Sequence, residues 1–437
     1  MIFPVSAVFV TYAFPPNGGS GVQRVYKFVK YLPTYGIGAS VITAKSVLKT
    51  TADSSLLHDL HPDTKVIRAA SLDPMFVADL VSRGMSNARA TTVNNGRSVK
   101  SAFFKRTFEF LLIVRNFLRI PDQYIGWLPF AVAAGLRHLR SIQNPVIVAS
   151  LPIYSTALVA YCLSRLTGAP LILDFRDGWV DDPYLELPTR FHRKLHCALE
   201  KRVVNHAKHL IVYGEWLGDI YKKKYPNTPT TIILNGFDED DFKFESLCKR
   251  DENIIKLVYS GSLFQYHREF LEMVFAAVQM IPEQVKARVR LVFAGDIQLT
   301  LFDELVERYK LNKYITKLGY IPHKEAIKQM LTADALLFTI PRGDVSSYTS
   351  KIFEYLAAHR PIISFVCEEG CGARLLRDFG HHHWLIDYDA ERATDVFSRI
   401  DQLKSVVFEN APELVARIER KQQAGTLAEI VRKTAAI

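Results

Sequence analysis

Short runs of β-branched and aromatic residues alternate along this chain with longer amphipathic segments, and no other feature limits the fold as strongly. Runs of four to eight such residues are typical of buried strands, and the segments between them have the length and apolar spacing of helices. Regular alternation of strand and helix is the pattern of βαβ units, which build parallel sheets covered by helices. The sequence therefore predicts an α/β protein with Rossmann-like sheets.

The alternation occurs in two series, separated by an acidic, irregular stretch at 238–253 that we interpret as a linker. The first series predicts strands at 6–11, 39–43, 65–68, 146–150, 170–175, 209–213 and 231–234, and helices at 21–35, 103–119, 125–140, 154–167 and 190–207. The second predicts strands at 256–260, 290–294, 315–318, 335–339, 361–365 and 383–386, and helices at 268–280, 301–309, 323–333, 350–359, 371–379, 390–403 and 412–434. We expect a domain at 1–247, a second at 248–415, and a last helix at 416–437 that returns to the first.

The net charge of +10 originates in the first third of the chain. Residues 1–150 hold 17 Lys+Arg and 7 Asp+Glu, whereas residues 251–437 hold 24 and 25. Within the first third, residues 83–119 carry eight basic residues and one acid, and the helix at 103–119 has apolar and basic faces. Such a helix either lies in a membrane interface or packs on a core. We expect an anionic membrane surface to meet residues 83–119, and the lack of a recognisable nucleic-acid module disfavours nucleic acid.

The cysteines and the apolar segments indicate the compartment. The five cysteines are odd in number and scattered, which fits a reducing environment. The first residues predict a strand rather than a signal peptide, and no run of about 18 uncharged apolar residues occurs. We therefore expect a cytoplasmic protein, peripheral on the inner face of the cell membrane. Cys367 and Cys371 precede three histidines, but their spacing fits no common zinc site, so we expect no metal.

Two glycine-containing turns each follow a predicted strand and precede a helix. The first, FPPNGGSGVQR, contains Gly18 and Gly19, which would let the backbone and the helix N-terminus approach an anion. It does not have the dinucleotide-binding spacing, and a plain tight turn is the alternative. The second, YSGSL, contains Gly261 and is followed by Arg268. A cation there would stabilise a departing diphosphate, or Arg268 is a solvated residue in the first helical turn.

The segment SSYTSKIFEYLAAHRPII is the most informative. Thr349 or Ser350 caps a helix, Lys351 lies in its first turn, and Glu354 follows one turn later among apolar residues. Lys351 opposes the helix dipole and so suggests a phosphate partner. Glu354 requires hydrogen-bond donors, such as the two hydroxyls of a ribose. Alternatively, Lys351 and Glu354 pair with each other.

A third polar segment, DFRDGWVDDP, follows the predicted strand at 170–175. Asp174, Arg176 and Asp177 thus lie at the carboxyl end of a strand, where ligands of open α/β sheets bind. The alternative is a structural cluster of salt bridges centred on Arg176.

Taken in order, FPPNGGSGVQR, DFRDGW, NGFDEDDF and TSKIFEYLAAHRPII resemble the motifs of the family-4 retaining glycosyltransferases of the GT-B architecture, over nearly the whole chain. The resemblance implies two Rossmann-like domains facing each other across a cleft, with C-terminal helices returning to the first domain. It also implies a nucleotide-sugar donor held mainly by the second domain, an acceptor bound mainly by the first, retention of configuration, and no required metal.

The resemblance also implies roles for single residues. Gly19 and its neighbours would face the donor phosphates and the reaction centre, Arg268 and Lys351 would neutralise the diphosphate, and Glu354 would bind the ribose. The DFRDGW motif would lie near the acceptor. The chain departs from the family pattern at Ser346, where such enzymes commonly carry a Glu eight positions before the ribose-binding one.

We therefore expect a glycosyltransferase for hexosyl or N-acetylhexosaminyl transfer from a UDP- or GDP-sugar. The expected acceptor is a lipid-linked saccharide in the synthesis of a cell-surface polysaccharide. Two alternatives stay open. One is a sugar-nucleotide epimerase or hydrolase of the same architecture, and the other is a non-enzymatic, basic protein that binds nucleic acid or membrane through a degenerate site.

Overall fold

The computed structural model divides into two compact units, Met1–Ile233 with Ala424–Ile437, and Leu234–Gln423. The residues that the structure describes are 3–17, 20–45, 57, 59–72, 120–182, 185–243, 250–297, 299–406, 408 and 411–436. Gly18, Gly19 and the basic segment 83–119, with its predicted helix at 103–119, lie outside these residues. The chain passes from the first unit to the second after Ile233 and returns after Gln423.

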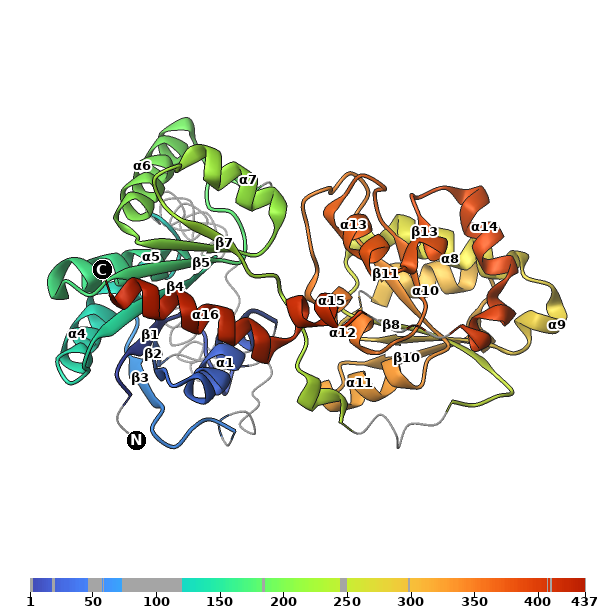
Figure 1. Cartoon of the computed structure of the whole chain (residues 1–437). Helices are drawn as coiled ribbons and strands as arrows, with labels where there is room; N and C mark the ends of the chain where they lie inside the picture. Colours follow the sequence, from blue (N-terminus) through green and yellow to red (C-terminus); the bar gives the residue numbers. More distant parts are fainter. Residues whose placement is uncertain are drawn as a thin grey trace, which may run out of the picture. The chain divides into compact units, whose positions relative to one another are not determined.

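The first unit is built on a parallel sheet of seven strands in the order β3-β2-β1-β4-β5-β6-β7 (Figure 1). Their bounds are β1 (Ser6–Val10), β2 (Gly38–Ala44), β3 (Lys65–Ala69), β4 (Pro145–Leu151), β5 (Leu171–Phe175), β6 (His209–Val212) and β7 (Thr230–Ile232). The central strands are buried on both faces, which explains their nearly continuous apolar sequences such as PVIVASL in β4. The strand order reverses between β1 and β4, the topological switch point of this sheet.

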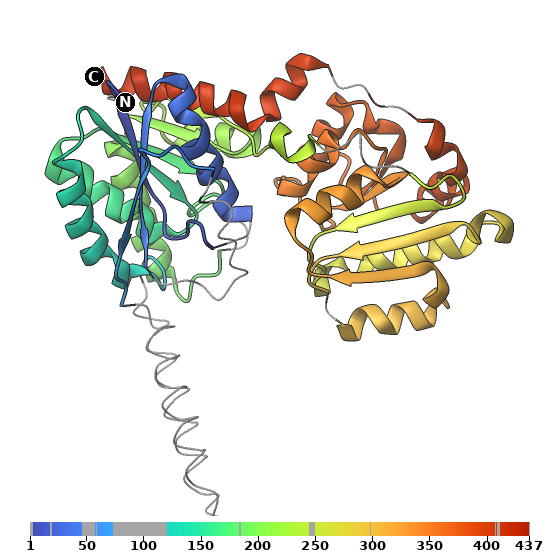
Figure 2. The same cartoon turned by 90° about the horizontal axis from the view of Figure 1, so that it is seen from below.

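Helices cover both faces of the first sheet. They are α1 (Ser20–Tyr31), α4 (Leu128–Leu139), α5 (Tyr154–Thr167), α6 (Arg190–His206), α7 (Glu215–Lys224) and α16 (Arg420–Ala435), with short 3₁₀ turns at Leu32–Tyr35 and Ile125–Trp127. Phe9 of β1, Phe28 of α1 and Leu427 of α16 belong to one buried apolar cluster. Figure 2 accordingly shows α16 beside α1, although more than 380 positions separate them in the chain. The opposite face packs on α4 and α5.

The second unit contains a parallel sheet of six strands in the order β10-β9-β8-β11-β12-β13. Their bounds are β8 (Ile255–Ser260), β9 (Val289–Ala294), β10 (Ile315–Gly319), β11 (Ala335–Thr339), β12 (Ile362–Phe365) and β13 (Leu385–Ile386). Its helices are α8 (Arg268–Met280), α9 (Glu283–Lys286), α10 (Leu299–Arg308), α11 (His323–Leu331), α12 (Ser350–Ala357), α13 (Cys371–Asp378), α14 (Ala390–Ser398) and α15 (Pro412–Ile418), with 3₁₀ turns at Glu239–Phe242, Gln265–His267, Asn312–Tyr314, His381–Trp384 and Ile400–Ser405. Here the strand order reverses between β8 and β11.

The sequence predicts the strands of both sheets, but three helical features differ. The single-turn helix α9 is not predicted, because four residues are too few for a periodic apolar pattern. Helix α7 is not predicted, because Gly218 interrupts its pattern and lowers its helix propensity. A Cβ at Gly218 would lie 3.3 Å from Ile232, so close packing on β7 explains the glycine.

The predicted helix at 412–434 is two helices, because Glu419 is extended. Glu419 forms a parallel bridge with Phe237, and its carboxylate accepts hydrogen bonds from the amides of Lys421 and Gln422 at 2.9 and 2.7 Å. Glu419 thus ends one helix and caps the next. A Cβ at Gly236 would lie 2.0 Å from the carbonyl oxygen of Ile418, so the NGF motif provides the close backbone contact at this crossing.

Among the residues that the structure describes, no helix combines the length and the apolar composition that crossing a membrane requires.

Candidate functional site

The switch point of the second sheet brings together most of the residues that the sequence predicts for a donor site. Gly261 follows β8, and the loop after β11 leads into α12, so both lie at the carboxyl edge of neighbouring strands. The amide of Ser260 donates a hydrogen bond of 2.7 Å to the hydroxyl of Tyr355, a buried residue of α12. This bond fixes the β8 loop against the helix that carries Lys351 and Glu354.

The loop at Gly261 is held close to the end of β9. The amide of Gly261 donates to the carbonyl oxygen of Ala294 at 2.8 Å. Gly295 has a φ of +138°, and a Cβ there would lie 2.1 Å from the carbonyl oxygen of Gly261. Only glycine fits at position 295, and the close approach leaves the Gly261 backbone at the edge of the sheet.

Helix α12 begins at this edge with its N-terminus uncapped by a side chain. Thr349 is the N-cap residue, as the sequence predicts, but its hydroxyl makes no capping hydrogen bond. Thr349 and Ser350 are half-buried. Because the first amides of a helix have no partner within it, this N-terminus can bind an anion such as phosphate.

Lys351 and Glu354 form the ion pair that the sequence analysis gives as an alternative to ligand binding. The Lys351 Nζ lies 2.8 Å from the Glu354 Oε2, and the side chains are 31% and 17% exposed. An ammonium group has three donors and a carboxylate about four acceptor sites, so the pair leaves capacity on both groups. The pair orients the two side chains without preventing contact with a ligand.

His323, which the sequence does not predict as a site residue, joins this pair. It begins α11 directly after Pro322; its Nδ1 lies 4.0 Å from the Glu354 Oε1 and its Nε2 3.4 Å from the Asp241 Oδ2. Nothing in the local sequence distinguishes this histidine, since its partners come from two distant segments.

The charges of Lys351, Glu354, His323 and Asp241 shift the pKa values of His323 and Glu354. Desolvation of the His323 ring favours the neutral form, but the hydrogen bond to Asp241 and the charge of Glu354 outweigh it, so the pKa of His323 is raised. For Glu354, desolvation would raise the pKa, but the cations Lys351 and His323 lower it overall. Glu354 is therefore held as a carboxylate, the form that accepts hydrogen bonds from hydroxyl groups.

Arg268 is the first residue of α8 and lies at the surface. Its Nε lies 3.1 Å from the Glu272 Oε1, and Arg308 contacts the same carboxylate at 3.5 Å. The structure thus brings Gly261, Thr349, Ser350, Lys351 and Glu354 together, and it places Arg268 one short turn beyond the β8 loop.

Ser346, which stands where the related enzymes commonly carry a Glu, is buried. The Asp344 Oδ1 accepts hydrogen bonds from the Ser346 amide at 3.0 Å, the Ser346 hydroxyl at 3.1 Å and the Ser347 amide at 3.1 Å. Asp344 therefore stabilises its own loop.

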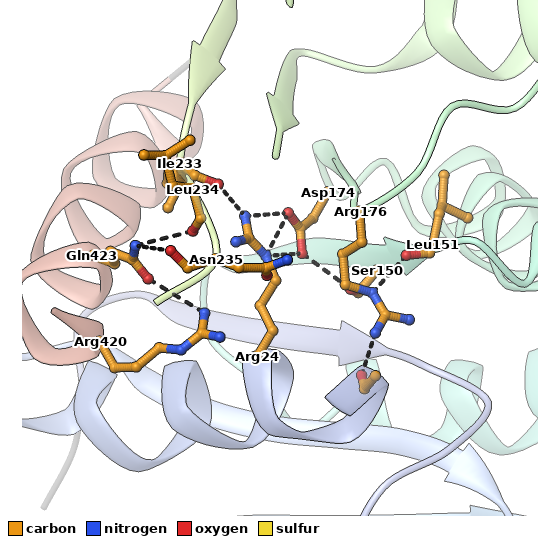
Figure 3. Close-up of polar contacts among 11 residues, drawn as sticks. Arg24, Ser150, Leu151, Asp174, Arg176, Ile233, Leu234, Asn235, Arg420 and Gln423 are labelled. Atoms are coloured by element: carbon orange, nitrogen blue, oxygen red, sulfur yellow. Dashed lines mark hydrogen bonds and ion pairs between the residues drawn. The ribbon is translucent and has the colours of Figure 1, made fainter. Parts of the chain in front are cut away.

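In the first unit, Asp174 is a buried partner of Arg24 (Figure 3). The Arg24 guanidinium approaches the Asp174 Oδ1 at 2.8 Å, and the Ser150 hydroxyl donates to the Oδ2 at 3.0 Å. Arg24 also donates to the carbonyl oxygen of Ile233 at 2.9 Å. The salt bridge is centred on Arg24 rather than on Arg176, and it joins α1, β5 and the end of β7.

Arg176 and Asp177 have different surroundings from Asp174. The Arg176 guanidinium donates to the carbonyl oxygen of Leu151 at 2.6 Å and to that of Gly21, which links β4 and α1 across the switch point. Asp177 is exposed at the end of β5. Desolvation by the surrounding protein raises the pKa of Asp177 to about 6, with Arg176 lowering it and Asp182 raising it.

The described part of the chain contains no cluster of three His, Cys, Asp or Glu side chains that could hold a metal ion. Cys367 accepts a hydrogen bond from the amide of Gly343 at 3.0 Å, and Cys371 is buried at the start of α13.

Comparisons with known proteins agree with this architecture. A family model described as glycosyl transferases group 1 matches residues 255–403, which form most of the second unit. Sucrose-phosphate synthase from Thermosynechococcus elongatus has a similar structure, with 14% identity, 99% of each chain covered and a TM-score of 0.61. WaaG, a glycosyltransferase involved in lipopolysaccharide biosynthesis, has 13% identity, 99% of this chain and 98% of its own covered, and a TM-score of 0.52.

A putative UDP-N-acetylglucosamine 2-epimerase from Listeria monocytogenes shares the fold as well, with 10% identity, 98% of this chain and 96% of its own covered, and a TM-score of 0.53. No curated protein sequence matches the chain. The two parallel α/β units and the matched domain define a glycosyltransferase with the GT-B fold. Residues 255–403 of the second unit are similar to the group 1 glycosyltransferases.

Proposed function

We propose that this chain is a retaining glycosyltransferase that moves a hexosyl or N-acetylhexosaminyl group from a UDP- or GDP-sugar to a lipid-linked saccharide. The observation that carries the donor part of the proposal is the meeting of Gly261, the α12 N-terminus, Lys351 and Glu354 at the switch point of the second sheet. Ligands of open α/β sheets bind at this position.

Each group in this arrangement suits one part of a nucleotide diphosphate. The uncapped amides of α12 and the backbone at Gly261 suit the phosphates, and Lys351 adds a positive charge beside them. As the bond to the sugar breaks, negative charge grows on the departing diphosphate, and fixed cations stabilise it most at that moment. In this proposal Lys351 and Arg268 supply that charge, so no metal is required, and the Glu354 carboxylate accepts hydrogen bonds from the ribose hydroxyls.

The acceptor side of the proposal belongs to the first unit. Asp177 is exposed at the carboxyl end of β5, and a carboxyl group with a pKa of about 6 can accept or donate a hydrogen bond near neutral pH. We assign it to contact with a sugar hydroxyl of the acceptor, with Arg176 positioning its loop. Asp174 contributes to this site only through the buried ion pair beneath it.

A lipid-linked acceptor and a role in polysaccharide synthesis at the cytoplasmic membrane surface are supported by two observations. The excess positive charge lies in residues 1–150, within the unit assigned to the acceptor. WaaG, which shares the fold, is involved in lipopolysaccharide biosynthesis. In this proposal residues 83–119 contact the anionic membrane, so flotation with anionic vesicles should weaken as salt rises.

Binding of UDP and GDP to the wild type and to Glu354→Ala tests the donor site. We expect about a tenfold to hundredfold loss of affinity, because hydrogen bonds to a charged group contribute roughly 1.5–3 kcal/mol. Isothermal titration calorimetry measures the change, and Glu391→Ala, at an exposed position of α14, is the control that should bind as the wild type does. Equal affinity of Glu354→Ala and wild type would remove the ribose role.

A sugar-nucleotide epimerase or hydrolase is a second candidate function, because the chain shares its fold with a putative epimerase. The two are separated by the time course of UDP or GDP release from a panel of UDP- and GDP-sugars. A transferase releases nucleotide when acceptor is added, whereas a hydrolase releases it from donor alone.

A further inference from the structure

Helix α6 lies on the outside of the first unit (Figure 1). Its sequence and burial pattern give it a strongly basic exposed face. We call this surface, together with the adjoining ends of α5 and β6, the α6 basic face. Its basic residues are all exposed: Arg165, Arg190, Arg193, Lys194, Lys201, Arg202 and Lys208. Arg190, Lys194 and Lys201 follow one another in α6 at spacings of four and seven residues, which places them on one side of the helix. Lys208 lies just beyond the end of α6.

The only acid of α6 is turned away from this face. Glu200 is completely buried; its Oε1 lies 2.7 Å from the Lys224 Nζ and accepts a hydrogen bond of 2.6 Å from Tyr225, and its Oε2 accepts one from the Val180 amide. The negative charge of the buried Glu200 is thus balanced by Lys224. The outer side of the helix therefore presents only positive charge.

Among the residues that the structure describes, no acidic side chain pairs with the α6 basic face. Within the described ranges, no carboxylate forms an ion pair with any of its seven basic side chains; Arg202 donates a hydrogen bond to the Tyr161 hydroxyl at 3.1 Å. Of the nearest acids, Asp181 pairs with Lys224 at 2.6 Å, and Glu186 precedes the helix. Residues 73–119 hold eight basic residues and three acids, so their sequence is unsuited to serve as an acidic partner.

Large apolar side chains are exposed near both ends of α6. Phe191, in the first turn of α6, is 62% exposed, and Leu166, at the end of α5, is 64% exposed. Leu166 lies toward the far end of α6, because the neighbouring Ser164 hydroxyl is 2.9 Å from the His206 Nε2. Since a residue adds about 1.5 Å to a helix, the face extends for roughly 25 Å between them.

We propose that the α6 basic face docks on an anionic lipid surface, with α6 parallel to the membrane and Phe191 and Leu166 entering the headgroup region. A helix with basic residues on its outer side and apolar side chains beside them is suited to this interface. A phosphate backbone would satisfy the charges but would offer no apolar region for the two exposed side chains. This surface deepens the proposed membrane function and is separate from residues 83–119.

The first test is flotation of the full-length protein with vesicles of phosphatidylcholine, alone or with one-third phosphatidylglycerol. We expect Arg190→Glu/Lys194→Glu/Lys201→Glu to reduce binding to the anionic vesicles at least tenfold, because each basic side chain near such a surface contributes about a factor of five. The control, Lys310→Glu/Lys313→Glu/Lys328→Glu, changes the net charge equally at exposed positions of the second unit and should retain binding. Equal losses in both variants would overturn the proposal.

The second test uses Cys197, an exposed thiol within the α6 basic face. With the other four cysteines replaced by Ala, an environment-sensitive fluorophore on Cys197 should shift its emission to the blue with anionic vesicles, whereas a fluorophore on Lys310→Cys in the cysteine-free protein should not. An unchanged Cys197 signal during vesicle binding would overturn the proposal, since docking would then occur elsewhere. Tight binding of a single-stranded RNA oligonucleotide, lost in the α6 variant, together with no vesicle binding would also overturn it.

Neither vesicle flotation nor the Cys197 fluorescence depends on the donor site. The experiments therefore distinguish an error in the docking proposal from an error in the proposed glycosyltransferase function. The Arg190/Lys194/Lys201 variant should bind UDP or GDP as the wild type does. Loss of nucleotide binding in Glu354→Ala should leave flotation unchanged.

Discussion

Asp174 and Asp177 are three positions apart but have opposite environments. Asp174 is buried against Arg24, whereas Asp177 is exposed at the end of β5. The sequence places both at the carboxyl end of a strand, and that prediction is correct. The sequence could not assign Asp174 to a structural ion pair, because its partner Arg24 lies on helix α1, 150 positions away.

Replacing Asp174 should destabilise the first unit strongly. Asp174→Ala leaves the buried Arg24 guanidinium without its counter-charge, and losing one member of a buried pair costs about 3–5 kcal/mol. Urea denaturation can follow the first unit in a Trp384→Phe background, where the three remaining tryptophans lie in that unit. Asp219→Ala, at an exposed position of α7, should change the free energy of unfolding by less than about 0.5 kcal/mol. An Asp174→Ala protein of wild-type stability would contradict the structural role.

His323 should titrate above its ordinary pKa of 6.5 because of Asp241 and Glu354. The folded state then binds the proton more tightly than the unfolded state. The stabilising contribution of His323 is complete below about pH 6.5 and is lost as the pH rises through the raised pKa.

NMR titration of ¹³C-labelled histidine measures this pKa directly, with His323→Gln identifying the signal. Asp241→Asn should lower the pKa of His323. His267, in the same unit, is the internal control, because desolvation lowers its pKa and Asp241→Asn should leave it unchanged. The same His323 pKa in wild type and Asp241→Asn would show that Asp241 has no part in it.

Among the elements, strands are predicted better than helix ends. The alternation of apolar runs identifies every strand of both sheets, because a buried strand requires a local apolar run. Helix α7 and the break at Glu419 are not predicted, because a contact with a distant segment decides each of them. Gly218 is explained by β7, and Glu419 by its bridge to Phe237.

Helix α16 should be essential to the first unit although it ends the chain. Leu427, Ile430 and Val431 are buried in the cluster that contains α1 and β1. Removing residues 424–437 should lower the stability of the first unit by on the order of 5 kcal/mol, since each such side chain contributes about 1.5–3 kcal/mol when buried.

Hydrogen exchange measured by mass spectrometry can locate this loss. Amides of β1, β2 and β4 should exchange faster in the truncated protein, and those of β8 and β9 should not. A protein that ends at Ala435 is the matched control. Equal loss of protection in both units would contradict the assignment of α16 to the first.

At the scale of the whole molecule, two units repeat one architecture but differ in charge. The first 150 residues carry the excess of ten positive charges, and the second series is balanced. The structure adds that basic residues beyond residue 150 also gather, on the α6 basic face. Residues 190–208 hold six Lys+Arg and one acid, Glu200, so the sequence contains the charge. Only the fold shows that Glu200 is buried while the basic side chains are exposed.

The sequence by itself determined the α/β class, the strands of both sheets, and the segment that contributes Thr349, Ser350, Lys351 and Glu354. These depend on periodicity and on neighbours within a few residues, so a local pattern is sufficient to predict them. Only the tertiary structure decided that Asp174 pairs with Arg24, that His323 joins Glu354, and that α6 presents positive charge alone. Each of these depends on which distant segments the strand order brings together, and no local pattern records that order.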